Sequence, residues 1–264
     1  MDGRNMFDLS GRVALVTGGG YGIGRSICEA VAEFGADVAI ADIDDDAAHE
    51  TAGIVRQLGR RTLAIKADVS NSADVERMVQ ETLSKLGAID ILFNNAGLLI
   101  GSSPVHETTD EIWDRTMAVN LRGVFLCTRA VLPVMLKQKK GSIINTASAG
   151  GIVPGDRTLG SVVYDVTKGA VITFTRKTAA EYGREGIRVN AIAPGMIADT
   201  KFAAERRAVR PKEESMKVGQ AYMDRTALGR FGRPDELKGI AVYLASDASS
   251  YATGQVFVVD AGWS

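Results

Sequence analysis

The chain has 264 residues, of which 45% are hydrophobic and 24% charged, a balance typical of a soluble globular protein. With 31 basic and 32 acidic side chains the net charge is −1, so no basic excess favours nucleic acid or an anionic membrane as a partner. The N-terminal segment lacks the apolar core of a secretory signal, and no apolar run approaches the roughly 20 residues needed to cross a bilayer. We therefore expect a cytoplasmic protein.

The cysteines and histidines argue against a metal site. Cys28 and Cys127 are widely separated and lie in apolar surroundings, so we expect buried free thiols rather than a disulfide. Together with His49 and His106 they show no spacing typical of metal ligands. His49 is typical of a solvated helix residue, and His106 is a candidate substrate contact.

Short β-branched runs alternate with amphipathic stretches along the whole chain. Strands are predicted at 12–17, 37–42, 61–68, 89–97, 141–148, 187–194 and 254–262. Helices are predicted in IGRSICEAVAEFGA after the first strand and at 44–59, 72–86, 108–118, 121–139, 161–183 and 234–246. The stretch at about 196–225 is polar and irregular.

This alternation predicts a Rossmann-type, doubly wound α/β fold, in which a seven-stranded parallel sheet carries helices on both faces. No linker or shift in composition divides the chain, so we expect one domain over residues 1–264. In the stretch at 196–225, Arg206, Arg207, Arg210 and Lys212 alternate with Glu205, Glu213 and Glu214. The basic residues could attract an anionic substrate, but the alternation favours a solvated helical lid over the substrate site.

The segment TGGGYGIG (17–24) has the composition of a phosphate-binding loop. Gly18, Gly22 and Gly24 would let the backbone turn tightly, approach a pyrophosphate and pack the next helix against the sheet. Tyr21 and Ile23 complete the predicted loop, and the helix that follows supplies N–H groups for the phosphates. A merely glycine-rich turn is the alternative, but strand, glycines and helix occur in the order that a dinucleotide requires.

Asp42 ends the second predicted strand, 18 residues after Gly24. This spacing is close to that expected of an acid that hydrogen-bonds a ribose 2′-hydroxyl, and a carboxylate would repel a 2′-phosphate. We therefore predict NAD rather than NADP as the cofactor. The alternative is that Asp42 caps the next helix.

Small, polar or turn residues also end the later strands. Because ligands bind beyond the carboxyl ends of the strands in such sheets, these residues are candidates for cofactor or substrate contacts. An Asx-turn that leaves the strand is an equally plausible interpretation of the amide and carboxylate side chains. The candidates are Asp68 and Val69, Asn95 and Gly97 in NNAG (94–97), Ser148, and Pro194 and Gly195.

The sequence YDVTK (164–168) places Tyr164 and Lys168 one helical turn apart on the same face. Alone, this spacing is common by chance. Together with TGGGYGIG, NNAG, Asn120 in VNLRGVF, Ser148 in INTAS, RVNAIAPG and TGQVFVVDAG, it resembles the short-chain dehydrogenase/reductase family from about residue 11 to residue 262.

The resemblance implies reversible hydride transfer between NAD and a secondary alcohol or ketone, without a metal. It implies Tyr164 as general acid/base, Lys168 as the residue that stabilises the phenolate and holds the nicotinamide ribose, and Ser148 as the residue that holds the substrate oxygen. Asn120 would hold a water that relays protons through Lys168. A free phenol has a pKa near 10, and lowering it by three units needs roughly 4 kcal/mol, which we expect Lys168 to supply once the bound ribose partly dehydrates it.

Two features depart from the family pattern. Ser148 and Tyr164 are 16 positions apart, about three more than is usual, so GDRTLGS (155–161) is expected to bulge into the substrate mouth. Ser161, three residues before the tyrosine, is a poorer candidate because it falls inside the predicted helix start. The family threonine expected at 199 is Asp199, so Ile197 and Thr200 are expected to contact the nicotinamide carboxamide from a shifted loop.

Other functions remain open. A 3-oxoacyl-type ketoreductase is the main alternative to an alcohol dehydrogenase, and a catalytically silent NAD-binding regulator or a lyase or epimerase is less favoured. The resemblance also implies a homotetramer, with a dimer as fallback, in which helices 108–139 and 161–183 pair and the last strand packs against its mate. The apolar segment 124–136 supports such pairing.

Overall fold

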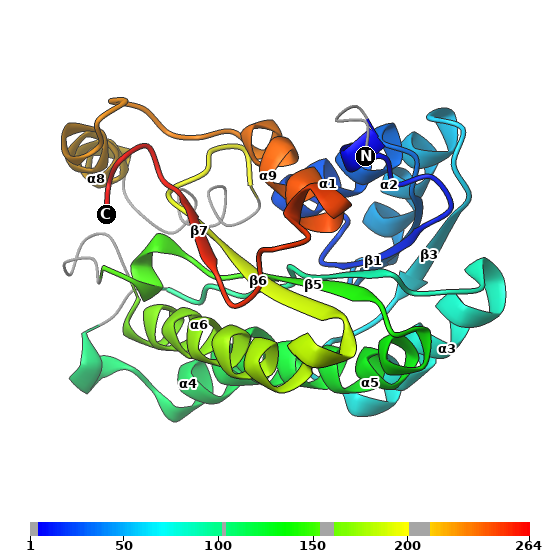
Figure 1. The fold of residues 1–264 in the computed structure, drawn as a ribbon. Helices are drawn as coiled ribbons and strands as arrows, with labels where there is room; N and C mark the ends of the chain where they lie inside the picture. Colours follow the sequence, from blue (N-terminus) through cyan, green and yellow to red (C-terminus); the bar gives the residue numbers. More distant parts are fainter. Residues whose placement is uncertain (1–4, 102–103, 154–160, 201–211) are drawn as a thin grey trace.

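The structure is a computed structural model that describes residues 5–101, 104–153, 161–200 and 212–264. Seven parallel strands form one sheet in the order β3-β2-β1-β4-β5-β6-β7 (Figure 1). This order confirms the predicted Rossmann-type, doubly wound fold. The strands are β1 Val13–Thr17, β2 Asp37–Asp42, β3 Thr62–Lys66, β4 Ile91–Asn94, β5 Gly141–Thr146, β6 Ile187–Pro194 and β7 Val256–Val259.

Helices cover both faces of the sheet. Helices α3, α5 and α6 pack on one face, and α1, α2 and α9 pack on the other (Figure 1). The helices of the described residues are α1 Gly22–Glu33, α2 Asp45–Gln57, α3 Ser72–Leu86, α4 Asp110–Met117, α5 Gly123–Gln138, α6 Val162–Tyr182, α8 Lys212–Arg225 and α9 Lys238–Ala245.

The central strands β1, β2 and β4 are mainly apolar because both of their faces are covered, whereas the edge strands β3 and β7 are partly exposed. In β1, Val13 and Leu15 join the core on one side of the sheet, and Ala14 and Val16 join the core on the other. A strand exposed on one face would instead alternate apolar and polar residues. The continuous apolar runs in the sequence therefore predicted the layers correctly.

Helix boundaries follow local capping signals. The side chain of Asp44 accepts a hydrogen bond from the Ala47 N–H and begins α2, and Asn71 begins α3 in the same way. The strands β3, β4, β5 and β7 are shorter than predicted, since the chain leaves the sheet early at their carboxyl ends. The segment predicted as irregular at 196–225 contains the helix α8.

The two helices predicted at 108–118 and 121–139 are one continuous helix, because a π-helical turn at Ala118–Arg122 joins α4 to α5. The helix of residues 110–138 contains an 18-residue window with a mean hydropathy of 1.4, long and apolar enough to cross a membrane by length and composition. The expectation that no apolar run approaches this length was therefore wrong. Half of the window is buried inside the protein, as in the core helix of a globular fold.

Candidate active site

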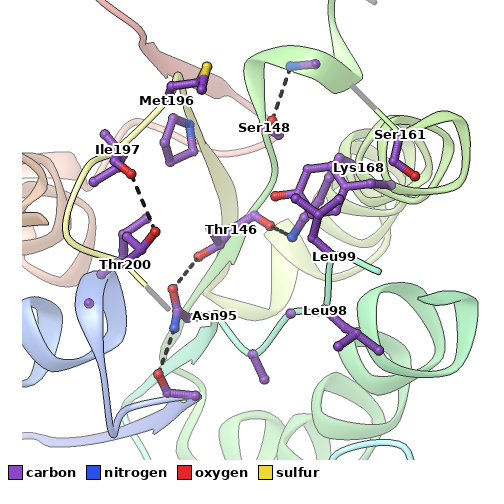
Figure 2. Close-up of a pocket in the computed structure, with 18 of the residues that line it drawn as sticks. Asn95, Leu98, Leu99, Thr146, Ser148, Ser161, Lys168, Met196, Ile197 and Thr200 are labelled. Atoms are coloured by element: carbon purple, nitrogen blue, oxygen red, sulfur yellow. Dashed lines mark hydrogen bonds between the residues drawn. The ribbon is translucent and has the colours of Figure 1, made fainter. Parts of the chain in front are cut away.

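A pocket of about 1180 Å³ lies beyond the carboxyl ends of the strands. Figure 2 shows part of its lining, which comes from the loops that follow β1, β4, β5 and β6 and from helix α6. This is the position where ligands bind in open α/β sheets. The pocket brings together nearly all predicted site residues: Gly18, Tyr21, Gly22, Ile23, Gly24, Asp42, Asp68, Val69, Asn95, Gly97, Ser148, Tyr164, Lys168, Pro194, Gly195, Ile197 and Thr200.

The glycine loop has no room for side chains. A Cβ on Gly24 would overlap the carbonyl oxygen of Gly18, and a Cβ on Gly18 would lie 2.8 Å from the Cα of Ala96. Gly18 has a φ of +64° and Gly22 a φ of +50°, which L side chains rarely adopt. The close contact between Gly24 and the loop brings helix α1 against the end of β1, as the motif predicts.

Asn95 holds the glycine loop from the neighbouring strand. Its Nδ2 donates to the carbonyl oxygens of Thr17 (3.2 Å) and Gly18 (3.1 Å), and its Oδ1 accepts from the Thr146 hydroxyl (3.4 Å) (Figure 2). The Asn95 side chain therefore links the carboxyl ends of β1, β4 and β5 and does not form an Asx-turn. Asp68, in contrast, does form a local turn, since its Oδ1 accepts from both the N–H and the hydroxyl of Ser70.

Asp42 faces the pocket and does not cap the next helix. Its two carboxylate oxygens accept hydrogen bonds from the N–H groups of Gly20 (2.9 Å) and Asp44 (3.0 Å). The cap of α2 is Asp44, whose second oxygen accepts from the hydroxyl of Tyr21 at 2.8 Å. This hydrogen bond raises the pKa of Tyr21. The helix-cap alternative for Asp42 is therefore excluded by the geometry.

Lys168 is buried beside Tyr164. Its Nζ donates to the carbonyl oxygen of Thr146, the last residue of β5, at 2.6 Å (Figure 2). The same Nζ lies 5.5 Å from the centroid of the Tyr164 ring. Only 2% of Lys168 is exposed, and burial lowers its pKa from 10.5 to about 8. The fold itself dehydrates this lysine, without the bound ribose to which the sequence analysis assigned that effect.

Two serines lie near this pair. Ser148 lies two residues beyond β5, and its Oγ accepts from the N–H of Gly150 at 3.2 Å. Ser161 was expected inside the helix start, but α6 begins at Val162, so Ser161 immediately precedes the helix and lines the pocket. Both hydroxyls therefore belong to the lining.

Asn120, predicted as a catalytic residue, does not line the described pocket. It lies in the π-helical turn and is fully buried. Its amide exchanges two hydrogen bonds with the backbone of Leu98, at 2.8 and 2.6 Å, and donates to the Thr167 hydroxyl at 3.2 Å. The side chain thus ties the loop after β4 to helix α6.

Comparison with known proteins agrees with this arrangement. A family model described as enoyl-(acyl carrier protein) reductase matches residues 18–264. A sorbitol dehydrogenase of Cereibacter sphaeroides is 40% identical (96% of this chain and 98% of that protein), and 3beta-hydroxysteroid dehydrogenase 2 of Eggerthella lenta is 38% identical (97% and 96%). The crystal structure of a short-chain type dehydrogenase/reductase from Mycobacterium marinum superposes with a TM-score of 0.91 at 35% identity (99% and 98%). The chain belongs to the short-chain dehydrogenase/reductase family.

As a short-chain dehydrogenase/reductase, the protein is an oxidoreductase with a nicotinamide cofactor, NAD or NADP. Among the described residues, no cluster of His, Cys, Asp and Glu could hold a metal ion. Cys28 and Cys127 are buried and unpaired, as predicted, and burial raises the pKa of Cys127 to about 12.

The departures from the family pattern are only partly visible. Residues 155–160 of the predicted bulge lie outside the described residues, as do Glu205, Arg206, Arg207 and Arg210 of the predicted lid. Asp199 is exposed and has a φ of +54°, a conformation that Asp tolerates better than most residues. Thr200 follows it into the pocket, and its hydroxyl donates to the carbonyl oxygen of Ile197 at 3.4 Å.

Sequence reasoning missed the apolar part of the lining. Trp263 and Tyr222 come from the last five residues and from α8, and neither lies in a motif. Their only signal was the presence of large aromatic side chains in otherwise polar or terminal segments. His106 is exposed near Glu107 and does not line the pocket, so its candidacy as a substrate contact finds no support. His49 is exposed on α2, as expected.

Proposed function

We propose that this protein is an NAD-dependent dehydrogenase that transfers a hydride between NAD and a secondary alcohol or ketone, with Tyr164 as general acid/base. The observation that carries the proposal is the burial of Lys168 beside Tyr164 in a pocket that also contains the glycine loop. When bound, the nicotinamide ring supplies the hydride acceptor for oxidation and the hydride donor for reduction.

The buried lysine supports ionisation of the neighbouring phenol. A fall in the pKa of Lys168 from 10.5 to about 8 corresponds to a penalty of roughly 3 kcal/mol on its ammonium form. A phenolate at Tyr164 would offset this penalty, because opposite charges attract strongly where water is excluded. The same attraction would supply part of the roughly 4 kcal/mol that a phenol needs to act as a base near neutral pH.

In the oxidative direction, the substrate hydroxyl passes its proton to the Tyr164 phenolate while its carbinol C–H leaves as hydride, which yields a ketone. The Ser148 oxygen accepts from the Gly150 N–H, so its own O–H is available to donate to the substrate oxygen. We assign Asn120 a positioning role, because its amide links Leu98 to Thr167 of the catalytic helix.

The residues at the glycine loop fit NAD. The glycines let the loop pack tightly between β1 and helix α1, which begins at Gly22, so the N–H groups of the first turn can bind a pyrophosphate. A carboxylate has about four lone-pair positions, and Asp42 uses one on each oxygen for backbone N–H groups, so it can still accept from ribose hydroxyls. Arg25, a cation at this end, donates to Glu50 and to the Gly20 carbonyl instead of facing a 2′-phosphate.

A 3-oxoacyl-type ketoreductase is the second candidate, favoured by the acyl-carrier description of the matching family model. The presence of both Tyr164 and Lys168 argues against a catalytically silent regulator. The NAD-type acid at position 42 mildly favours oxidation. The one-domain organisation and a cytoplasmic location remain predictions.

We also propose a homotetramer, with a dimer as fallback. Apolar side chains are exposed on the helices expected to pair, namely Trp113, Phe125, Val162 and Val166. Strand β7 is an edge strand, since it pairs only with β6 among the described strands. A monomeric mass in light scattering at micromolar concentration would contradict this assembly.

The test of the activity is a panel of polyols, alicyclic alcohols, hydroxysteroids and 3-hydroxyacyl thioesters, followed by the absorbance of NADH. Reduction of NAD by at least one alcohol, lost in Tyr164→Phe, is expected. Full activity in Tyr164→Phe would overturn the assignment.

A further inference from the structure

The end of the pocket away from the glycine loop is formed by an aromatic wall, which we define as Met196, Tyr222, Phe231 and Trp263. Tyr222 stacks on Phe231 with ring centroids 5.4 Å apart and planes at 11°, and it lies 6.2 Å from Trp263. These four residues belong to one hydrophobic cluster, and all line the pocket. Tyr222 is buried, with only 2% of its surface exposed, so the half-buried Met196, Phe231 and Trp263 supply the apolar surface that the wall presents to a ligand.

Hydrogen bonds fix the wall before any ligand arrives. The N–H of Met196 donates to the Tyr222 hydroxyl at 2.8 Å, and the N–H of Gly232, next to Phe231, donates to the Met196 carbonyl at 3.1 Å. The Asp260 carboxylate accepts from the N–H groups of Gly262 and Ser264 and so fixes the turn that carries Trp263. A preformed apolar surface of this kind costs little ordering when it binds an apolar ligand.

The wall is connected to the proposed catalytic residues. Met196 directly follows Pro194 and Gly195 at the end of β6, and a Cβ on Gly195 would lie 2.5 Å from the Tyr222 hydroxyl. Figure 2 shows Met196 and Leu99 among the side chains around Ser148 and Lys168. A substrate whose hydroxyl reaches Tyr164 can therefore place its body against the wall.

The Arg225 guanidinium lies over the Trp263 ring, 5.9 Å from its centroid, but is not part of the described lining, and the charges of the lining do not favour an anion. Among the described lining residues the only cations are Lys168 and Arg115. Lys168 is buried beside Tyr164, and the side chain of Arg115 is 61% exposed, 3.5 Å from Glu111. Asp165 and Asp199 also line the pocket. An acyl thioester with a phosphorylated carrier would meet carboxylates there, and a polyol would lose water from its hydroxyls against aromatic rings.

We propose that the substrate is a neutral secondary alcohol carried on an alicyclic ring system of at least two rings, with the rings against the aromatic wall. This inference rests on the proposed function and narrows its substrate class. The carbinol loses its hydride to NAD and its proton to Tyr164, so the product is the corresponding cyclic ketone.

The kinetic test compares a decahydronaphthol and a 3β-hydroxysteroid with sorbitol and 3-hydroxybutyryl-CoA. The polycyclic alcohols should exceed the other two in kcat/KM by about 100-fold or more. Trp263→Ala should lower kcat/KM for the decahydronaphthol by about 10- to 100-fold, mostly through KM, and leave 2-butanol within about threefold. Phe34→Ala is the matched control: Phe34 is an exposed aromatic residue at the end of α1, outside the lining, and its loss should leave both substrates unaffected.

A binding measurement decides the question where turnover is slow or Trp263→Ala fails to fold. The chain has two tryptophans, so Trp113→Phe leaves Trp263 as the sole indole fluorophore. Adding decalone with NAD should change its emission, whereas sorbitol should not. Unchanged emission, or sorbitol or the CoA ester as best substrate, would overturn the inference and leave the proposed function intact. The proposed function fails separately, if no alcohol reduces NAD or if Tyr164→Phe stays active.

Discussion

The glycine-loop end of the pocket is built from backbone and short polar side chains, whereas the wall end is built from large apolar side chains. At the first end, Gly18 and Gly24 admit no Cβ, and Asn95 and Asp42 bind the loop through backbone groups. At the second, Tyr222 and Trp263 come from α8 and from the chain terminus. The first end suits a ligand common to a whole family, and the second suits a ligand particular to this protein.

The largest effect is expected at Tyr164, where the glycine-loop end and the wall end of the pocket meet. Tyr164→Phe should lower kcat by about 10³- to 10⁴-fold on the best alcohol, because proton transfer is lost. The affinity for NAD should stay within about threefold, since only a hydroxyl is removed. Steady-state rates and NAD titration by fluorescence measure the two effects. An equal loss of NAD affinity would show that Tyr164 is part of the cofactor site rather than the proton donor.

The glycine-loop end should tolerate substitution least. Gly24→Ala places a Cβ against the carbonyl of Gly18 and should cost about 3 kcal/mol or more in stability together with NAD binding. Gly53→Ala is the matched control on α2, where a Cβ meets nothing within 4 Å, and it should raise stability by roughly 0.5–1 kcal/mol. Urea unfolding measures both; a harmless Gly24→Ala would contradict the close packing of α1 against β1.

Asp42 is the proposed specificity residue of the glycine-loop end. Asp42→Ala should lower the ratio of NAD affinity to NADP affinity by about 10- to 100-fold. The substitution removes both a hydrogen-bond acceptor for the ribose and a negative charge that repels a 2′-phosphate. Dissociation constants of both cofactors, measured by calorimetry, test this. The kcat ratio between decahydronaphthol and 2-butanol should not change, because the wall end is untouched. Tighter binding of NADP than NAD in the unmutated protein would refute the role of Asp42.

A smaller effect concerns the stability cost of the buried lysine. The pKa of Lys168 is lower in the folded protein than the usual 10.5, so the unfolded chain binds more protons between about pH 8 and 10.5. Below about pH 8 the folded state therefore carries the full free-energy cost of burying the charged lysine, and this cost decreases as the pH rises to 10.5. Lys168→Met should be inactive, but its free energy of unfolding at pH 7 should be about 1–2 kcal/mol higher. This gain is the burial penalty that is removed, less the contribution of the lost hydrogen bond to Thr146. This gain should shrink as the pH rises from about 8 to 10.5; a less stable variant at pH 7 would contradict it.

The glycine-loop end could be predicted from the sequence because backbone geometry restricts its residue types and because these residues lie close together in the chain. Gly24 must contact Gly18 across six positions, and Asp42 follows at the end of the next strand, so both are readable as motifs. The wall could not be predicted, because Tyr222, Phe231 and Trp263 meet only through tertiary packing. The partners of Asn120 could not be predicted for the same reason: Leu98 and Thr167 are brought to it by the fold. The joined helix α4–α5 escaped prediction because a π-helical turn has no strong sequence signal.

The pH dependence of kcat/KM for alcohol oxidation tests the central claim, that Tyr164 and buried Lys168 act as one proton-transfer unit. With the pKa of Lys168 lowered to about 8, the pair loses its first proton near that pH, and the remaining proton can move to the lysine and leave a phenolate. The account predicts a rate that rises with pH through an apparent pKa at or below about 8. A rise centred near 10, the ordinary value of a free phenol, or a flat profile would contradict it.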